Sequence, residues 1–217
     1  MRTIEDIKRQ RDDLSTFLIH LTRDTEDRSA RENLVNIFNT QIIEAKNPKG
    51  LCHNWSSEFS NNTKSVCFTE TPLNYVRYLF DIEGREIHLK PYGLVFSKAF
   101  LQEKGANPVF YINTYAGSEL KNAFCRIINS HEDKASVYKI IPYVDIFGPT
   151  AAAGKKYDFY WEREWRYSQN LTFTYDEVVV GICDESDMVD FNGKYNGIKF
   201  ISPSMSMQEM IEKIAKR

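Results

Sequence analysis

The sequence predicts one α+β domain over residues 1–217, built on a mixed or antiparallel split β-sheet core with flanking helices. Strand-like and helix-like segments are intermingled, without the regular alternation of strand and helix that a doubly wound parallel sheet requires. No internal repeat occurs, and no segment rich in Gly, Pro or Ser divides the chain. The 217 residues, 42% of them hydrophobic, are enough to bury a core without disulfides or metals.

Composition and charge exclude several classes of protein. A charged fraction of 27% is typical of a globular protein, so we do not expect intrinsic disorder. The 28 Lys and Arg residues against 30 Asp and Glu leave a net charge of −2, which excludes a strongly basic nucleic-acid coat but not a local basic channel. Because no membrane-spanning apolar run and no signal-peptide core is found, we expect a cytoplasmic chain without a membrane partner.

Metal and phosphate-loop chemistry are not indicated. The four cysteines are far apart and form no Cys-x-x-Cys pair, and no histidine has a partner at metal-ligand spacing. The Gly-rich loops that bind dinucleotides or triphosphates are absent, as is the nucleophile motif of hydrolases. We therefore expect no metal site.

The elements follow from local patterns along the chain. Residues 17–22 are rich in strand formers between polar clusters, which predicts a buried strand. Ser29 with Glu32 forms a capping box before apolar residues at helical spacing, which predicts a helix. Further strands are expected at residues 42–43, 65–69, 92–96, 108–112, 138–147, 157–167, 178–183 and 198–201. Further helices are expected after Thr71-Pro72, at 99–104, after the cap Ser118, and along the apolar face Met207, Met210, Ile211 and Ile214.

The first candidate site lies on the strand at 17–22. Side chains alternate along a strand, so Leu18, His20 and Thr22 share one face, while the other face is apolar throughout. An imidazole and a hydroxyl two residues apart suit hydrogen bonds to the vicinal hydroxyls of a sugar. The alternative is a core histidine bonded to a backbone carbonyl.

The second candidate site is the segment 160–166. If it is a strand, Glu162 and Glu164 stack on one face and repel, so Arg166 or another cation must lie close, or one carboxyl pKa must rise. One carboxylate of such a pair is suited to grip a ribose hydroxyl and to stabilise an oxocarbenium-like transition state. A solvated strand with cross-strand ion pairs is the alternative.

The third candidate site is the strand-to-helix junction at 66–73, where free backbone N–H groups could receive an anion such as pyrophosphate. Plain helix capping explains the same residues. Tyr75 and Tyr78 follow on the helix, and they either stack on an aromatic base or belong to the core.

Two resemblances to known families are carried by these segments. His20-Leu21-Thr22, Asn33-Leu34 and residues 42–45 resemble the opening strand and helix of DarT-type ADP-ribosyltransferases and their RNA phosphotransferase-like relatives. Four segments spread over most of the chain look like the AbiGi family of abortive-infection proteins, which is associated with phage resistance and described as the antitoxin of a two-component system. They are residues 66–73 (VCFTETPL), 91–96 (PYGLVF), 105–112 (GANPVFYI) and 162–166 (EREWR).

The transferase resemblance implies an ADP-ribosyltransferase-like fold with NAD as the substrate. It assigns His20 and Thr22 to the adenosine-side ribose, and Tyr78 or Tyr92 to the nicotinamide ring. Glu164 would bind the nicotinamide ribose and stabilise the oxocarbenium ion, and the acceptor is unknown, with a nucleic acid favoured by the DarT likeness.

The same resemblance gives roles to the other charged residues. Glu162 would be the second carboxylate and activate the acceptor. An arginine is expected at the pyrophosphate, with Arg23, Arg77 and Arg166 as candidates. The whole prediction requires His20 and Glu164 to line one sugar-sized slot.

Two other functions compete with ADP-ribosyl transfer. The chain could be a non-catalytic antitoxin that binds a partner toxin through an exposed apolar patch. A nuclease acting through His20 and Glu164 has less support, because neither a second histidine nor a metal-binding carboxylate cluster is indicated.

Overall fold

The computed structural model describes residues 11–46, 63–80, 82, 87–115, 118–130, 134–149 and 156–215. The chain divides into two compact units. Unit 1 comprises Met1–Ile43, Phe68–Lys104 and Thr172–Arg217, and unit 2 comprises Glu44–Cys67 and Gly105–Leu171. Strands and helices are intermingled, which confirms the predicted α+β class. The single domain stays a prediction.

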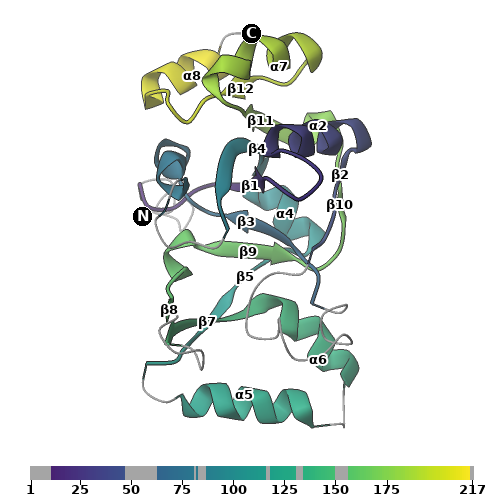
Figure 1. The fold of residues 1–217 in the computed structure, drawn as a ribbon, viewed down its shortest axis with the longest axis vertical. Coiled ribbons are helices and arrows are strands. Elements are labelled where there is room, and N and C mark those ends of the chain that lie inside the picture. Colours follow the sequence, from purple (N-terminus) through teal and green to yellow (C-terminus); the bar gives the residue numbers. More distant parts are fainter. Residues whose placement is uncertain are drawn as a thin grey trace, which may run out of the picture. The chain divides into compact units, whose positions relative to one another are not determined.

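A mixed β-sheet forms the centre of unit 1 (Figure 1). Its strands lie in the order β12, β11, β4, β1, β3. Their bounds are Phe200–Ile201 for β12, Val178–Ile182 for β11, Leu89–Ser97 for β4, Phe17–Arg23 for β1 and Val66–Thr69 for β3, whose Phe68 and Thr69 belong to unit 1. β1 is antiparallel to β3 and β4, and β4 to β11, whereas β11 and β12 are parallel.

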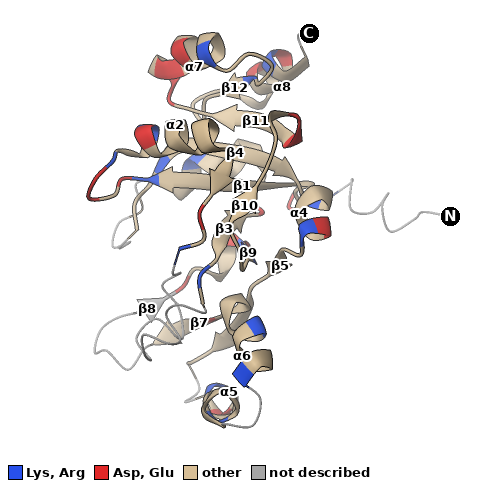
Figure 2. Ribbon diagram, turned by 90° about the vertical axis from the view of Figure 1, so that its right-hand side faces the viewer, with Lys and Arg blue, Asp and Glu red and all other residues tan. Residues whose placement is uncertain are grey.

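The helices of unit 1 lie where the sequence places them, apart from the one at Met188–Lys194 and the short 3-10 turns, which were not predicted. They are α2 (Ala30–Thr40), η1 (Leu73–Leu79), α4 (Lys98–Lys104), α7 (Met188–Lys194) and α8 (Met207–Ala215), with short 3-10 turns η4 (Tyr175–Glu177) and η5 (Glu185–Asp187). The predicted capping box of Ser29 and Glu32 is present at α2. η1 is a 3-10 helix with Pro72 as its N-cap residue. In Figure 2, α4 and α7 each carry both basic and acidic residues, as the balanced charge leads one to expect.

The two faces of β1 are packed differently, as predicted. Ile19 and Leu21 enter an apolar cluster to which η1 contributes Val76 and Leu79 and α8 contributes Met210. On the opposite face the Thr22 hydroxyl bonds to α2, at the carbonyl oxygen of Ala30. β2 (Ile42–Ile43) and β10 (Leu171–Thr172) form a separate two-stranded sheet.

Unit 2 contains short strands and helices. β5 (Asn107–Pro108) is antiparallel to β9 (Glu164–Tyr167), and β7 (Val144–Pro149) is parallel to β6 (Phe110–Asn113) and antiparallel to β8 (Lys156–Tyr157). The helices are α5 (Glu119–Asn129), α6 (Lys134–Ile140), η2 (Ile141–Tyr143) and η3 (Tyr160–Glu162). Ser118 caps α5 as predicted. The hydrophobic core of unit 2 consists of Ile112, Ile128, Val137, Ile141, Val144 and Ile146.

The predicted strand at 138–147 is wrong in its first half. α6 continues to Ile140 and η2 extends to Tyr143, so that β7 begins only at Val144. The run is rich in β-branched and aromatic residues, which favours a strand by composition. Val137 and Ile141, however, are one helical turn apart and both enter the core of unit 2, and this packing overrides local propensity.

The predicted strand at 157–167 is interrupted. η3 occupies Tyr160–Glu162, and Arg163 takes a left-handed backbone conformation with φ 51° before β9 starts at Glu164. The predicted strand at 108–112 is also divided: Val109 separates β5 from β6. The backbone N–H of Val109 donates to the carbonyl oxygen of Glu164 at 2.9 Å. Within the described ranges, none of the helices combines the length and the apolar character needed to cross a membrane.

Gly93 provides a test of the unit 1 sheet. It lies in β4 opposite Leu21 of β1, and a Cβ placed there would lie far inside van der Waals contact with the carbonyl oxygen of His20. We expect Gly93→Ala to lower the free energy of unfolding by about 1–3 kcal/mol, because a main-chain oxygen inside a sheet cannot move away. Urea unfolding followed by circular dichroism measures the change.

Gly193 offers the matched control. It lies within α7, and a Cβ there meets nothing within 4 Å. Gly193→Ala should leave the free energy of unfolding unchanged or raise it by up to about 1 kcal/mol, because alanine is the better helix former. Equal unfolding midpoints for the two variants would contradict the described packing of β4 on β1.

Candidate functional site

Glu164, a predicted catalytic residue, lies in a buried charge cluster of unit 2. Glu164 and Arg166 share one face of β9 because side chains alternate along a strand. Arg166 Nε donates to Glu164 Oε1 at 2.9 Å, and Arg166 Nη2 donates to Oε2 at 3.0 Å. The sequence predicted a cation beside this carboxylate, and Arg166 is that cation.

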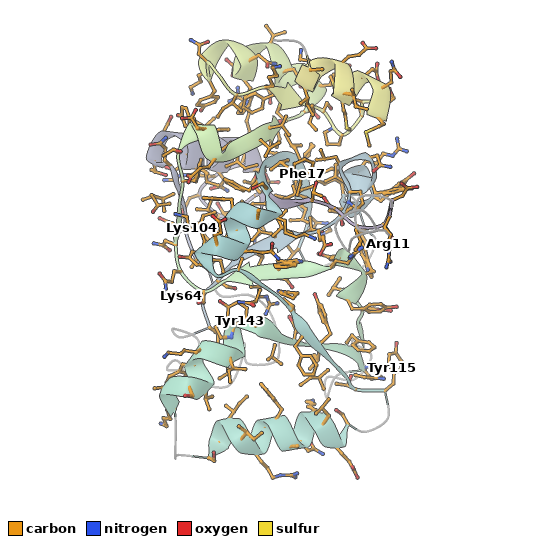
Figure 3. The ribbon with its side chains drawn as sticks, turned by 180° about the vertical axis from the view of Figure 1, so that it is seen from behind. Arg11, Phe17, Lys64, Lys104, Tyr115 and Tyr143 are labelled. Atoms are coloured by element: carbon orange, nitrogen blue, oxygen red, sulfur yellow. The ribbon has the colours of Figure 1, made fainter. Side chains whose placement is uncertain are left out.

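Arg166 also binds two other elements of unit 2. Its side chain is only 2% exposed. Its Nη2 donates to Asp145 Oδ2 at 2.6 Å, and its Nη1 donates to the carbonyl oxygen of Pro142 at 3.0 Å. Tyr143, labelled in Figure 3, follows Pro142, and its hydroxyl donates to Ser168 Oγ at 3.2 Å. One guanidinium therefore connects β9 with β7 and η2.

Two further side chains complete this group, which we call the Arg166 cluster: Arg166, Glu164, Asp145, Tyr111 and Cys67. The Tyr111 hydroxyl donates to Glu164 Oε2 at 3.3 Å, and the Cys67 thiol hydrogen-bonds Glu164. Sequence reasoning missed Asp145. The available signal was an acidic residue inside the apolar run 144–147, since a buried carboxylate requires a cation.

The two carboxyl groups of the cluster are shifted in opposite directions. Burial alone would raise the pKa of Glu164, but the charge and hydrogen bonds of Arg166 outweigh it and lower that pKa. Burial dominates at Asp145, whose pKa is raised even though Arg166 opposes the shift. The charge of Arg166 favours the ionised form of both carboxyl groups, and at Glu164 it outweighs the effect of burial.

The remaining cluster groups are held in their neutral forms. Burial, together with the negative charge of Glu164, raises the pKa of the Cys67 thiol and of the Tyr111 hydroxyl. Because the thiolate is the nucleophilic form of cysteine, Cys67 is a poor nucleophile at neutral pH. Both oxygens of Glu164 are occupied by donors of the same unit, so the cluster acts as an internal ion pair.

Glu162 does not stack on Glu164 along a strand, contrary to the sequence prediction. It ends η3, and the left-handed turn at Arg163 separates it from β9. The strand alternation that would place both carboxylates on one face is therefore broken. The predicted acceptor-activating role of Glu162 stays a prediction.

Among the predicted ligands of unit 1, Thr22 and Tyr92 are brought together. The buried Thr22 hydroxyl contacts the carbonyl oxygens of Ala30 at 2.8 Å and Tyr92 at 3.1 Å, so its one proton is used inside the unit. The Tyr92 hydroxyl donates to Asp187 Oδ2 at 2.7 Å. Arg31 Nε donates to the same Asp187 oxygen at 3.0 Å. These contacts account for both residues as parts of the packing between β4, α2 and η5.

His20 and Glu164 belong to different units. His20 is partly buried in unit 1, with its ring edge-on to Phe68 at 5.9 Å between centroids. Glu164 lies in the Arg166 cluster of unit 2. The slot that was to join them stays a prediction. Within the described ranges, no group of three or more His, Cys, Asp or Glu side chains is arranged to hold a metal ion.

Tyr78 is exposed on η1 beside Tyr75. Their exposed fractions are 60% and 46%, so the alternative that placed these tyrosines in the core is wrong. The rings stack at 6.2 Å between centroids with an interplanar angle of 29°. The nearby Glu70, at the strand-to-helix junction, forms an ion pair with Lys98 at 2.7 Å.

The structural role of Arg166 is testable by removal of its charge. We expect Arg166→Met to lower the free energy of unfolding by about 3–5 kcal/mol, because Glu164 and Asp145 would remain buried without their cation. Arg126→Met, at an exposed position of α5 in the same unit, is the control and should change stability by no more than about 0.5 kcal/mol. Similar urea midpoints for both variants would show that the ion pair contributes little.

The lowered pKa of Glu164 predicts a pH dependence. A carboxyl group with a folded pKa below its unfolded value stabilises the protein above the unfolded pKa, about 4.3, and loses this effect as pH falls through the folded pKa. Glu164→Gln should therefore be less stable than the parent by about 2 kcal/mol at neutral pH. The difference should shrink toward pH ~3 in urea unfolding curves. A difference that stays constant over this interval would show that the carboxylate charge is not what stabilises unit 2.

Comparison with known proteins identifies the family. Residues 48–207 match the family model described as "Putative abortive phage resistance protein AbiGi, antitoxin". No curated protein and no solved structure matches the chain significantly. The matched segment contains all five members of the Arg166 cluster as well as η1. Because the match extends over most of the chain, the protein belongs to the AbiGi family.

Proposed function

We propose that this protein is the antitoxin of a two-component abortive-infection system and that it protects the cell by binding its partner toxin. The observation that carries the proposal is the match over residues 48–207 to a family described as an antitoxin. Binding requires no reactive group, and this agrees with the internal use of the Arg166 cluster. Phage resistance would then depend on when the toxin is held and when it is released.

The environment of Glu164 favours binding over ADP-ribosyl transfer. A carboxylate stabilises a developing cationic sugar through its negative charge. At Glu164 that charge is shared with the guanidinium of Arg166, through two hydrogen bonds at 2.9 and 3.0 Å. A sugar cation would have to compete with a buried ion pair that unit 2 needs for its own packing.

The pyrophosphate role of Arg166 meets the same difficulty. Its side chain is almost wholly buried, and its donors already face Glu164, Asp145 and Pro142. A pyrophosphate would have to displace two carboxylates from it. ADP-ribosyl transfer from NAD, to a nucleic acid or to another acceptor, stays a prediction from the resemblance to DarT-type transferases.

Co-expression with the toxin of the same system tests the proposal. We expect the wild-type chain to restore the growth of toxin-expressing cells and to co-elute with the purified toxin in buffer without NAD. His20→Ala and Glu164→Gln should protect equally well once their soluble amounts are matched, because neither side chain would take part in chemistry.

The transferase alternative predicts the opposite results. Millimolar NAD would raise the melting temperature of the protein, nicotinamide would be released, and protection would be lost in His20→Ala and Glu164→Gln. Nicotinamide release together with loss of protection in these variants would overturn the binding proposal. Failure of the wild-type chain to co-elute with the toxin or to restore growth would do the same.

A further inference from the structure

Three side chains of η1 form an exposed aromatic and cationic surface on unit 1, which we call the Tyr–Arg surface: Tyr75, Arg77 and Tyr78. The two tyrosines are 46% and 60% exposed, and Arg77 is exposed as well. The rings stack on each other at 6.2 Å between centroids. A stack of two exposed tyrosines beside an arginine is suited to a protein partner, because the amphipathic tyrosine ring is enriched at interfaces.

Arg77 is held in position by Tyr78. Its Cζ atom lies 5.0 Å from the centroid of the Tyr78 ring, and its Nη2 donates to the Tyr78 hydroxyl at 3.2 Å. Among the ion pairs of the described residues, none involves Arg77. The surface therefore presents a positioned positive charge that a carboxylate from outside can neutralise.

The Tyr–Arg surface rests on a rigid base. Val76 and Leu79, on the opposite side of η1, are buried in the apolar cluster of unit 1. Leu73 and Phe80 pack against the same cluster at the two ends of η1. Because η1 is anchored by four apolar side chains, little backbone conformational entropy remains to be lost when a partner binds.

We propose that the Tyr–Arg surface is where the toxin docks and that it receives an acidic side chain of the toxin on Arg77, beside the ring of Tyr78. This inference rests on the antitoxin function proposed above. Tyrosine and arginine are the residue types most enriched among the energetically dominant positions of protein interfaces. Arginine binds a carboxylate through two parallel hydrogen bonds, and an aromatic surround excludes water from that contact.

The charge on the surface selects a carboxylate-bearing protein partner. A single-stranded nucleic acid also stacks on aromatic rings, but its affinity requires a basic groove that follows the phosphates. The chain has a net charge of −2, and Arg77 is the only basic residue of η1. An acidic protein surface is therefore the better match.

Binding of the purified toxin to purified variants, measured by isothermal titration calorimetry, tests this inference. We expect Tyr78→Ala and Arg77→Ala each to weaken the dissociation constant by about 30-fold or more, the effect of removing a dominant interface residue. The matched controls are Tyr115→Ala and Arg126→Ala in unit 2. Tyr115 is 50% exposed and is labelled in Figure 3. The controls should change the constant by less than about 3-fold.

The salt dependence of the affinity reports on the charge of Arg77. Added salt weakens attraction between exposed opposite charges. The wild-type affinity should therefore fall as salt is added, whereas the affinity of Arg77→Ala should fall less steeply. Arg77→Lys should recover part of the affinity, because the charge returns without the planar fork of arginine. Circular dichroism of each variant checks that the exposed substitutions leave the fold intact.

The outcomes distinguish failure of the proposed docking surface from failure of the proposed antitoxin function. If the wild-type chain binds the toxin and the η1 variants bind equally well, the docking surface is wrong while the antitoxin function stands. If the wild-type chain does not bind the toxin, the antitoxin function itself fails, and this inference fails with it. Loss of binding to a single-stranded oligodeoxynucleotide in Tyr78→Ala, with toxin binding unchanged, would overturn the inference in favour of a nucleic-acid surface.

Discussion

The buried guanidinium of Arg166 is the constraint on which the structure of unit 2 depends. Moving a charged group out of water costs on the order of several kcal/mol of free energy unless other partners replace its lost hydration. Glu164, Asp145 and the carbonyl oxygen of Pro142 supply those partners, and each comes from a different element. The relative placement of β9, β7 and η2 in this unit therefore depends on the hydrogen bonds and ion pairs that Arg166 makes.

The two arginines discussed above illustrate opposite uses of the same side chain. Arg166 is buried between carboxylates, and its charge is paired with Glu164 and Asp145 inside its own unit. Arg77 is exposed, is oriented by the ring and hydroxyl of Tyr78, and has the Tyr75 ring nearby. A protein that acts by holding a partner needs the second kind of residue rather than the first. Membership of a family described as an antitoxin agrees with that distribution.

Local patterns predicted most elements of the sheet in unit 1. The alternation over β1 assigned its faces, and the capping box located the start of α2, because both signals depend on residues that are close in sequence. The predictions failed over 138–143 and 157–163. There the composition favours strands, but the packing of Val137 and Ile141 and the left-handed backbone at Arg163 produce helical turns. Such choices depend on contacts that no short window of sequence contains.

The sequence by itself determined the α+β class and the pairing of Glu164 with a nearby cation, since residues two apart on a strand must share a face. It also determined the family, through segments spread along the chain. Only the tertiary structure decided that Asp145 joins Arg166 and that Tyr75 and Tyr78 are exposed. The physical reason is that periodicity states which side chains lie together on one element. Burial and the choice of ionic partners are decided by elements that are distant in the chain.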